Sequence, residues 1–260
     1  MEKGELSFKV FFDRASDQEE DFEQLVDIMQ KQGTRMINDV DRATWAIDKA
    51  TMHLEFLTHG IHVPYTIILP PWEDRQELDS IHLNKVGTPF VIKPACGGCG
   101  DGVFLNARTT DDIQAARQQF PYDKYLVQEK ISPIQINGRR AWFRVFYICG
   151  EVLPCWWDDQ TKITDVLFLS QIDPQVYSDM NRIMHKIAQI SQLDLFSTEI
   201  AFTQEHKLLV IDHVNDQVDL RKKSAHLDGI PDEVVDGIVI NLIVWVDKKV
   251  HSLSISEESS

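Results

Sequence analysis

A lysine and a glycine-rich segment stand next to each other in the run from Thr88 to Val103. Lys93 ends an apolar stretch typical of a buried strand, and four glycines follow it: Gly97, Gly98, Gly100 and Gly102. Glycine lets backbone N–H groups approach a ligand closely, and lysine supplies a point cation. The segment therefore favours phosphate binding, although an ordinary β-hairpin with a glycine-rich loop fits the same residues.

The two common nucleotide motifs are absent from this segment. It has no Gly-Lys-Ser/Thr sequence ahead of a helix, and its glycines do not follow the Gly-x-Gly-x-x-Gly spacing of a Rossmann turn. Phe104-Leu105 continues as strand, and residues 109–112 are typical of a helix N-cap. The order of strand, glycine loop, strand and helix predicts a small lid over a ligand.

Polar side chains gather at the ends of two later strands. Glu199, Asp212 and Asn215 offer the oxygen ligands that Mg²⁺ prefers, although surface residues at strand ends would look the same. Arg144 lies in a strand rich in aromatic residues, so it needs an anionic ligand or an acidic partner. With an apolar strand that could line a base, these residues suit a nucleoside triphosphate and Mg²⁺.

The composition limits the class of ligand. The chain has 260 residues, with 41 acidic against 26 basic side chains and a net charge of -15. A broad surface for nucleic acid or for an anionic membrane is therefore not expected. No signal segment precedes residue 20, and the apolar run over 234–246 is too short to span a membrane, so we expect a cytoplasmic protein. The pair Cys96 and Cys99 lacks a second pair of ligands, which disfavours a zinc or redox motif.

Two kinds of periodicity divide the chain into elements. Helical spacing predicts helices over residues 19–32, 38–60, 73–85, 113–119, 174–193 and 232–247. Alternation and apolar runs predict strands over residues 6–12, 34–37, 63–71, 88–94, 125–131, 196–202 and 207–212, and two strands turned by Gly150-Glu151 over residues 139–154. The fold class is thus α/β (α+β). We expect a short N-terminal lobe over residues 1–72, a lid over 73–124, a metal-binding subdomain over 125–249 and a disordered tail over 250–260.

From about Asn38 to Asn215 the order of these features resembles the ATP-grasp superfamily, the fold of glutathione synthetase and D-alanine:D-alanine ligase. Asp48-Lys49 with Gly60-Ile-His-Val-Pro64 is similar to its helix and Gly-Ile-x-Val-Pro turn, where the lysine reaches nucleotide phosphates. Pro89-Phe-Val-Ile-Lys93-Pro and the glycines after it are similar to its second lysine strand and phosphate-covering loop. Tyr125-Leu-Val-Gln-Glu-Lys-Ile131 is similar to its adenine-binding hinge.

The resemblance implies a role for each residue that matches. Phosphates would be held by Lys49, Lys93, Gly97, Gly98, Gly100 and Gly102. Base and ribose would be held by Gln128, Glu129, Lys130 and Ile131. Arg144 and Lys93 would act on the reacting groups, and Glu199 would be the first Mg²⁺ carboxylate.

The chain departs from the family pattern at two places. The family usually closes its metal site with Glu-x-Asn, whereas this chain has His213-Val214-Asn215 preceded by Asp212. Either a bulge turns Asp212 into the site or His213 replaces the carboxylate, and the preference of Mg²⁺ for oxygen favours Asp212. The lobe before Asp48 is also short, which leaves the acceptor site poorly defined. Plausible wall residues are Arg139, Arg140, Trp156, Trp157 and Arg221, although surface charge and core packing explain them equally well.

The activity that the resemblance implies is an ATP- and Mg²⁺-dependent carboxylate–amine ligase that acts through an acyl phosphate. Its partners would be a small-molecule carboxylate and an amine, with no nucleic acid and no membrane, and a homodimer stays open. The missing Glu-x-Asn and the short first lobe leave a non-catalytic ATP-binding or scaffold protein as an alternative. A kinase on the same fold is a third reading.

Overall fold

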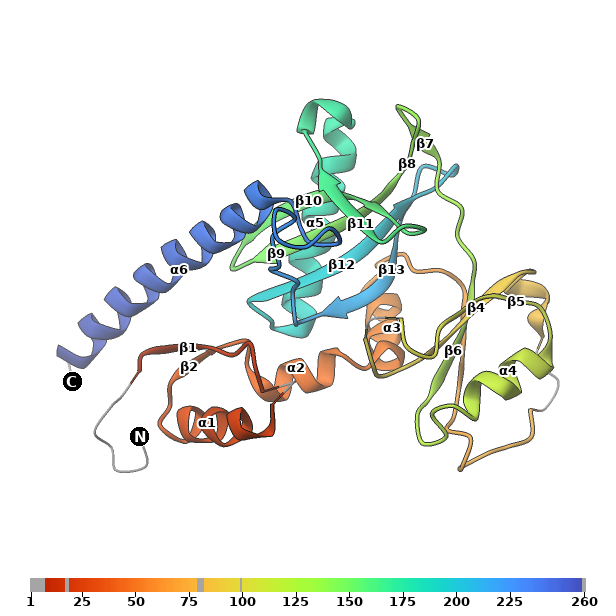
Figure 1. Ribbon diagram of the computed structural model, residues 1–260, viewed down its shortest axis with the longest axis horizontal. Helices are drawn as coiled ribbons and strands as arrows, with labels where there is room; N and C mark the ends of the chain where they lie inside the picture. The colour runs from red at the N-terminus through yellow and green to blue at the C-terminus, as the bar shows by residue number, and fades with distance from the viewer. Residues whose placement is uncertain (1–7, 17–18, 79–81, 99, 259–260) are drawn as a thin grey trace.

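The computed structural model describes residues 8–16, 19–78, 82–98 and 100–258. Two mixed layers of strand and helix face each other, and a small N-terminal unit lies beside them (Figure 1). Within the described residues, no helix is both long enough and apolar enough to cross a membrane.

The N-terminal unit is a single β-α-β crossover. Strand β1 (Val10–Phe12) pairs in parallel with β2 (Arg35–Ile37), and α1 (Glu20–Lys31) connects them. The inner face of α1 packs its apolar side chains on β2, with Met29 fully buried. The sequence predicts a strand over 6–12, of which residues 6 and 7 lie outside the described part.

Helices α2 (Val40–Ala46) and α3 (Lys49–Thr58) replace the single helix predicted over 38–60. The break falls at Asp48, whose carboxylate accepts hydrogen bonds from the N–H groups of Ala50 and Thr51 and so caps α3. A capping aspartate inside a helical pattern ends one helix and begins the next.

The lid sheet has four strands in the order β3-β6-β4-β5, and every neighbouring pair is antiparallel. Its strands are β3 (Thr66–Leu69), β4 (Phe90–Pro94), β5 (Phe104–Ala107) and β6 (Tyr125–Glu129). Helix α4 (Thr110–Arg117) covers one face, and Thr109 and Asp112 form a capping box at its start. The other face of the sheet is turned to the rest of the molecule.

The central sheet has five antiparallel strands in the order β11-β10-β9-β12-β13. They are β9 (Trp142–Ile148), β10 (Glu151–Asp158), β11 (Ile163–Val166), β12 (Leu195–Phe202) and β13 (Leu208–Asn215). Helix α5 (Pro174–Ser191) packs four buried apolar side chains on one face, which forms the largest core. The short hairpin of β7 (Gln135–Ile136) and β8 (Arg139–Arg140) precedes the sheet. Two short 3-10 helices, η1 (Leu83–Lys85) and η2 (Leu169–Gln171), complete the connections.

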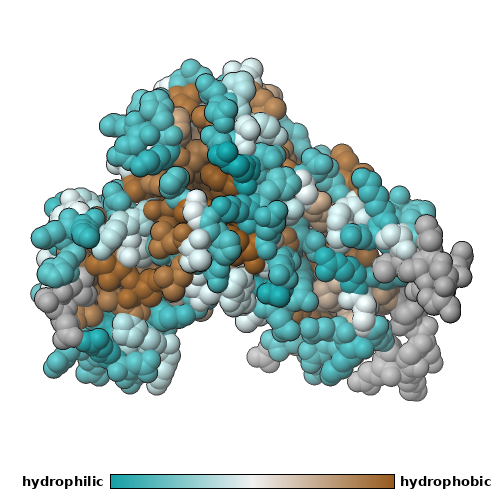
Figure 2. All heavy atoms as spheres, turned by 180° about the vertical axis from the view of Figure 1, so that it is seen from behind, coloured by the Kyte–Doolittle hydropathy of each residue, from teal (hydrophilic) through white to brown (hydrophobic). Residues whose placement is uncertain are grey.

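Helix α6 (Asp232–Glu258) runs from the central sheet towards the β1–β2 pair (Figure 1). Its buried residues, among them Ile238, join a core that includes residues of β1, β9 and β10. Seen from behind, the surface is hollowed between the lid side and the N-terminal side of the molecule (Figure 2).

Two further predictions about elements need correction. Residues 73–85 contain no α-helix in their described part. The start of this segment is held instead by Arg117, which donates to the carbonyls of Pro70, Pro71 and Arg75. The tail predicted to be disordered from residue 250 is helical as far as Glu258, since no glycine or proline follows Gly237 to stop α6.

The predicted subdomain boundaries can be compared with the composition of the sheets. The lid sheet takes β3 from the predicted N-terminal lobe and β6 from the predicted metal-binding subdomain. The boundaries at residues 72/73 and 124/125 therefore do not coincide with the edges of a sheet, and the division into lobes stays a prediction.

Candidate active site

A cavity of about 670 Å³ lies between the lid sheet and the central sheet. Strands β4 and β6 and the segment after β4 line one side, and strands β9, β12 and β13 line the other. Most of the residues singled out from the sequence line it together: Lys49, Lys93, Gly97, Gly98, Gly100, Gln128, Glu129, Lys130, Ile131, Glu199 and Asp212. Three do not: Gly102, Arg144 and Asn215.

Lys93 is the buried cation of the cavity. It is 7% exposed, and its Nζ donates a hydrogen bond of 2.8 Å to the carbonyl of Ile211 on the opposite sheet. Burial, together with the positive charge of Lys49, holds the pKa of Lys93 below its ordinary value, against the opposing pull of Asp212 and Glu199. An anion entering the cavity would therefore meet a cation that lacks full compensation.

Lys49 is a second cation at the first turn of α3. Its Nζ donates to the carbonyl of Gly97, at 2.6 Å, so the lysine reaches the start of the glycine loop (residues 97–102). Residue 99 of that loop, a cysteine, lies outside the described residues. The two lysines approach the cavity from different elements, as a phosphate chain requires.

The glycines of the loop differ in what surrounds them. Gly97 and Gly100 have positive φ angles of 98° and 82°, and a Cβ atom on either would meet nothing within 4 Å. A Cβ on Gly102 would come within 2.6 Å of the Phe120 ring. Gly102 thus allows close packing inside the lid, and its expected role in phosphate binding stays a prediction.

The metal-ligand question left by the sequence concerns two neighbours on β13. The pairing of β12 with β13 shifts register on both sides of Glu199, which stands opposite Asp212. Asp212 lines the cavity, whereas His213 is fully buried, stacks on Phe56 and lies 3.4 Å from His53 through its Nε2. A bulge in β13 therefore turns Asp212 and not His213 toward the cavity.

The charge of Asp212 follows from its neighbours. Burial alone would raise its pKa, but Lys93, Lys49 and Arg144 outweigh burial and hold the pKa of Asp212 below its usual value. The pKa of His213 is lowered far below the ordinary range, by burial first and by Lys93 second. A carboxylate facing the cavity and a neutral imidazole in the core are the result.

Glu199 on β12 has both carboxylate oxygens occupied. Arg144 donates to one oxygen at 3.0 Å, and the indole N–H of Trp142 donates to the other at 3.2 Å. The Arg144 guanidinium also lies 3.7 Å from the centroid of the Trp157 ring. Arg144 therefore has the acidic partner that was one of its two readings, and its place behind Glu199 explains why it does not line the cavity.

These residues can be tested against the needs of Mg²⁺. Asn215 pairs with Ser197 at the far end of β13 and lies outside the cavity lining, so the expected third ligand is not brought to the other two. The described residues contain no group of three His, Cys, Asp or Glu side chains that could hold a metal ion. Mg²⁺ is usually bound by one or two carboxylates together with substrate phosphates and waters, so Glu199 and Asp212 fit a metal that arrives with a triphosphate.

The hinge from β6 forms one wall of the cavity. Gln128 is 2% exposed and donates through Nε2 to Thr66 Oγ1 at 3.0 Å. Lys130 reaches Asn106 Oδ1 at 2.6 Å, and Ile131 packs in a small apolar cluster that includes Trp142 and Trp157. This wall offers apolar surface with polar edges, which suits a nucleobase.

Two contributions to the cavity were not assigned from the sequence. Trp142 holds Glu199, and its position two residues before Arg144 on one strand could have placed both on one face. Arg140, considered only as a wall residue, lines the cavity and forms two hydrogen bonds with Asp159, of 2.8 Å and 3.0 Å. That pairing joins β8 to the turn after β10, which are separated in sequence, so no local pattern predicts it.

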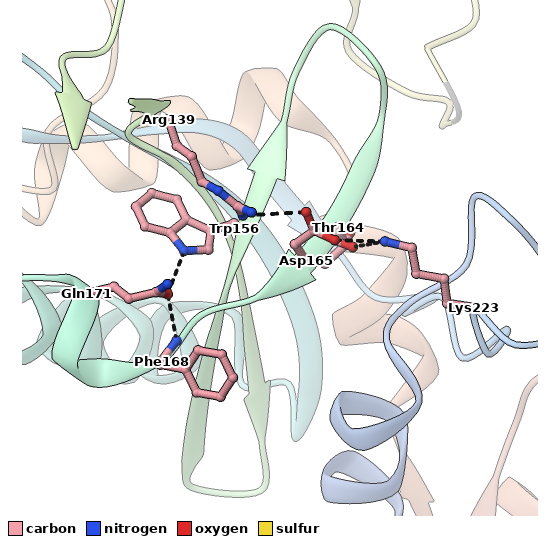
Figure 3. A network of polar contacts seen from close by, with 7 residues as sticks. All are labelled: Arg139, Trp156, Thr164, Asp165, Phe168, Gln171 and Lys223. Atoms are coloured by element: carbon pink, nitrogen blue, oxygen red, sulfur yellow. Dashed lines mark hydrogen bonds and ion pairs between the residues drawn. The ribbon is translucent and has the colours of Figure 1, made fainter. Parts of the chain in front are cut away.

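The other wall residues considered from the sequence belong to a structural network. Arg139 pairs with Asp165, which also binds Lys223 at 2.7 Å, and Trp156 donates to Gln171 Oε1 at 3.0 Å (Figure 3). Gln171 Oε1 also accepts from the backbone N–H of Phe168 (Figure 3). Arg221 pairs with Asp219 and Asp228. The contacts of Arg139 and Trp156 hold β11 and its connections, and those of Arg221 lie within the segment after β13. None of these three residues lines the cavity.

Comparisons with known proteins bear on the chain as a whole. A sequence model described as the RimK-like ATP-grasp domain matches residues 46–233. No curated protein sequence matches the chain. Among solved structures, D-alanine–D-alanine ligase from Bacillus anthracis complexed with ATP is 14% identical, with a TM-score of 0.64 over 90% of this chain and 75% of that one.

Two further structures are similar to the chain, with lower TM-scores. A RimK domain protein ATP-grasp from Sphaerobacter thermophilus is 16% identical, with a TM-score of 0.61 over 91% of this chain and 79% of that one. The VanG D-Ala:D-Ser ligase from Enterococcus faecalis is 15% identical, with a TM-score of 0.56 over 80% and 64%. At such identities the likeness establishes the fold.

Proposed function

Because the chain belongs to the RimK-like ATP-grasp family, we propose that it is an ATP-dependent ligase that joins a small-molecule carboxylate to an amine. The ligases of similar fold act on D-alanine and D-serine, and this supports a reaction of the same general class. The acid and the amine that this chain joins are not part of the proposal.

One observation carries the proposal. Two lysines, Lys49 and Lys93, and two carboxylates, Glu199 and Asp212, line the same cavity although they come from four different elements. Cations for phosphates opposite oxygen ligands for a divalent metal are the arrangement that phosphoryl transfer needs, since that reaction depends on positioning and charge neutralisation.

The proposed reaction has two steps. The substrate carboxylate attacks the γ-phosphorus of ATP and ADP leaves, and the amine then attacks the carbonyl carbon of the acyl phosphate and phosphate leaves. Mg²⁺ bound with ATP would neutralise charge on the phosphates, with Glu199 and Asp212 as its protein ligands. Lys49 and Lys93 would hold the phosphate oxygens, and the N–H groups of the glycine loop would cover them.

Arg144 has a different task in this proposal from the one expected from the sequence. Its guanidinium is held between Glu199 and the ring of Trp157. We assign it to orienting the Glu199 carboxylate, because a planar guanidinium with a stacked face and a bound carboxylate is fixed in direction.

The test measures ADP release from ATP in the presence of Mg²⁺, with amino acids and dipeptides supplied in pairs as the acid and the amine. A matched pair should raise ADP release. Lys93→Met should lower nucleotide affinity by about tenfold to a hundredfold, because the hydrogen bonds that it loses are to charged groups. Lys207→Met is the matched control, since Lys207 is exposed in the turn before β13, and it should behave like the wild type. Unchanged nucleotide affinity in Lys93→Met would contradict the proposal.

A second candidate is a nucleotide-binding protein without ligase activity. It is favoured by the position of Asn215 outside the cavity, which separates the expected third metal ligand from Glu199 and Asp212. Mg²⁺-dependent binding of ATP with no ADP release across the substrate pairs would support this candidate against the first. A phosphorylated product without an amide bond would instead identify a kinase.

A further inference from the structure

The side of helix α6 that faces away from the central sheet carries a stripe of apolar side chains. Four residues form this α6 stripe, and they are between 40% and 62% exposed: Val239, Ile240, Ile243 and Val244. Steps of three and four residues place them along one side of the helix. The buried residues of α6, such as Ile238, lie on the other side, in the core shared with β9 and β10. In Figure 1 the outer side of α6 lies at the edge of the molecule, where no other described helix or strand covers it.

Such a stripe is unusual within this chain. Helix α5 also packs one side on the central sheet, and its exposed residues are polar apart from Pro174 at its first position. A helix at the surface of a monomer normally follows that pattern, with polar side chains toward water. Contiguous exposed apolar surface, as on α6, marks a place where another molecule binds.

The charges at the two ends of the stripe indicate which molecule that is. Glu233 and Asp236 are exposed before the stripe, and Lys248 and His251 are exposed after it. Asp247 also lies at the second end, where its carboxylate is 3.4 Å from the His251 ring. The first end is therefore acidic, and the second end offers a lysine. A partner of a single charge sign would match only one end, whereas a second copy turned end to end matches both.

We propose that the protein forms a homodimer in which two α6 stripes pack antiparallel about a two-fold axis. Such an axis makes an interface self-complementary, and antiparallel helices set opposite dipole ends side by side. With the axis beside Leu242, Ile240 of one copy faces Val244 of the other. In the same register Asp236 of one copy faces Lys248 of the other, and the symmetry makes this pair twice.

Charge decides this register against its neighbour. Asp236 pairs with Lys222 of its own chain at 2.6 Å, yet its side chain is 57% exposed, so it can accept from Lys248 of the other copy as well. Moving the axis by half a residue would instead set Asp236 of one copy against Asp247 of the other. Charges that flank an apolar seam between helices fix register and orientation in this way.

The dimer leaves the cavity between the two sheets accessible. Helix α6 packs on the end of β9 that carries Phe146 and Ile148, whereas Trp142, at the other end of β9, lines the cavity. The inference therefore does not rest on the proposed function, and either can fail without the other.

Sedimentation velocity of the full chain over a concentration series tests the dimer. The wild type should pass from one chain of 30.0 kDa to twice that mass, with a Kd in the micromolar range. Ile243→Asp should raise the Kd by about a hundredfold or more, because it places two charges in the centre of the apolar seam. Leu227→Asp is the matched control, since Leu227 is 92% exposed in the segment before α6, and it should dimerise like the wild type. If Ile243→Asp lowers the melting temperature, Ile243→Ser is measured in its place.

Charge reversal tests the register. Asp236→Lys alone and Lys248→Glu alone should each raise the Kd by about tenfold or more, because each sets like charges together at both ends of the seam. An equimolar mixture of these two variants should recover the association of the wild type, because a mixed dimer again has opposite charges at both ends.

The opposite results are equally clear. A wild type that stays at 30.0 kDa up to about 100 µM overturns the proposal, and so does an Ile243→Asp variant that dimerises as the wild type does. A mixture of Asp236→Lys and Lys248→Glu that fails to associate overturns the antiparallel register. These measurements contain no nucleotide, so none of their outcomes bears on the proposed function.

Discussion

Asp212 and His213 are adjacent in the chain and have opposite environments. The irregular pairing of β12 with β13 directs the Asp212 side chain into the cavity. The imidazole of His213 stacks on Phe56 in the core. In a regular strand, alternate residues share a face, so such a bulge decides which side chain can meet a ligand. The two residues therefore carry separable properties, one of binding and one of stability.

Asp212→Asn should weaken the Mg²⁺-dependent part of ATP binding by about tenfold or more, because the amide cannot replace a charged ligand. Its melting temperature should change little. His213→Ala should instead lower the unfolding free energy by about 2–4 kcal/mol, because it leaves a void in the core. Its ATP binding should still require Mg²⁺. Calorimetric ATP titrations with and without Mg²⁺, combined with urea unfolding, measure both. Loss of the Mg²⁺ requirement in His213→Ala alone would reverse the assignment.

Within the glycine loop, Gly98 and Gly102 have different surroundings and therefore different roles. Gly98 has free space where a Cβ atom would stand, and its φ is not positive. Gly102 has a φ of 69° and lies against Phe120, which follows α4. The second glycine is therefore part of the packing that joins the loop to the rest of the lid.

Gly102→Ala should destabilise the protein by about 1–3 kcal/mol, because alanine is strained at positive φ and its Cβ meets the Phe120 ring. Gly98→Ala should leave the melting temperature nearly unchanged and weaken nucleotide binding, since a Cβ keeps phosphate away from the backbone N–H groups. Differential scanning fluorimetry and ATP titration separate the two effects. Equal melting temperatures for both variants would show that Gly102 is not held by packing.

Elements whose signal is local were predicted from the sequence. Helix α5 has four buried apolar residues at helical spacing and begins at a capping aspartate, and both features are visible in the chain. The segment over 73–85 also has helical spacing, but Arg117, distant in sequence, binds the carbonyl of Arg75 at its start and those of Pro70 and Pro71 just before it. Tertiary partners of this kind override propensity and leave no local trace.

The same limit applies to the site. Lys93 and the glycines could be predicted from residue type and spacing. The opposing carboxylates, Glu199 and Asp212, could be predicted from their place at strand ends. The choice between Asp212 and His213 depends on a bulge, and the pairing of Arg144 with Glu199 depends on which strands become neighbours. These are properties of sheet register, which a single sequence does not fix.

At the scale of the whole molecule, α3 links the two sheets. On the lid side, the N–H of Lys49 donates to Ala95 at 2.9 Å and Asp48 pairs with Lys124. On the other side, His53 is buried against His213 of β13. Burial, and secondarily the charge of Lys93, lowers the pKa of His53 to about 4. The stability of the entire fold is therefore linked to a histidine that must stay neutral.

The sign of the pH dependence follows from that shift. Unfolded His53 takes up a proton near its ordinary pKa of about 6.5, while the folded form resists until about pH 4, so stability is complete above pH 6.5 and falls as the pH drops towards 4. Between pH 7 and pH 5 the unfolding free energy of the wild type should fall, and in His53→Phe this fall should be smaller by about 2 kcal/mol. Urea unfolding at both pH values tests this. His59→Gln, a change at an exposed histidine that follows the same helix, should keep the wild-type slope. Parallel curves for wild type and His53→Phe would refute the link.

The attachment of α3 to both sheets has a mechanical consequence. When one sheet rotates against the other, α3 cannot remain at rest, because it is bonded at its first turn to the lid and wedged in its middle against β13. Any change in the angle between the two sheets must therefore either move α3 with it or break the contact of His53 with His213.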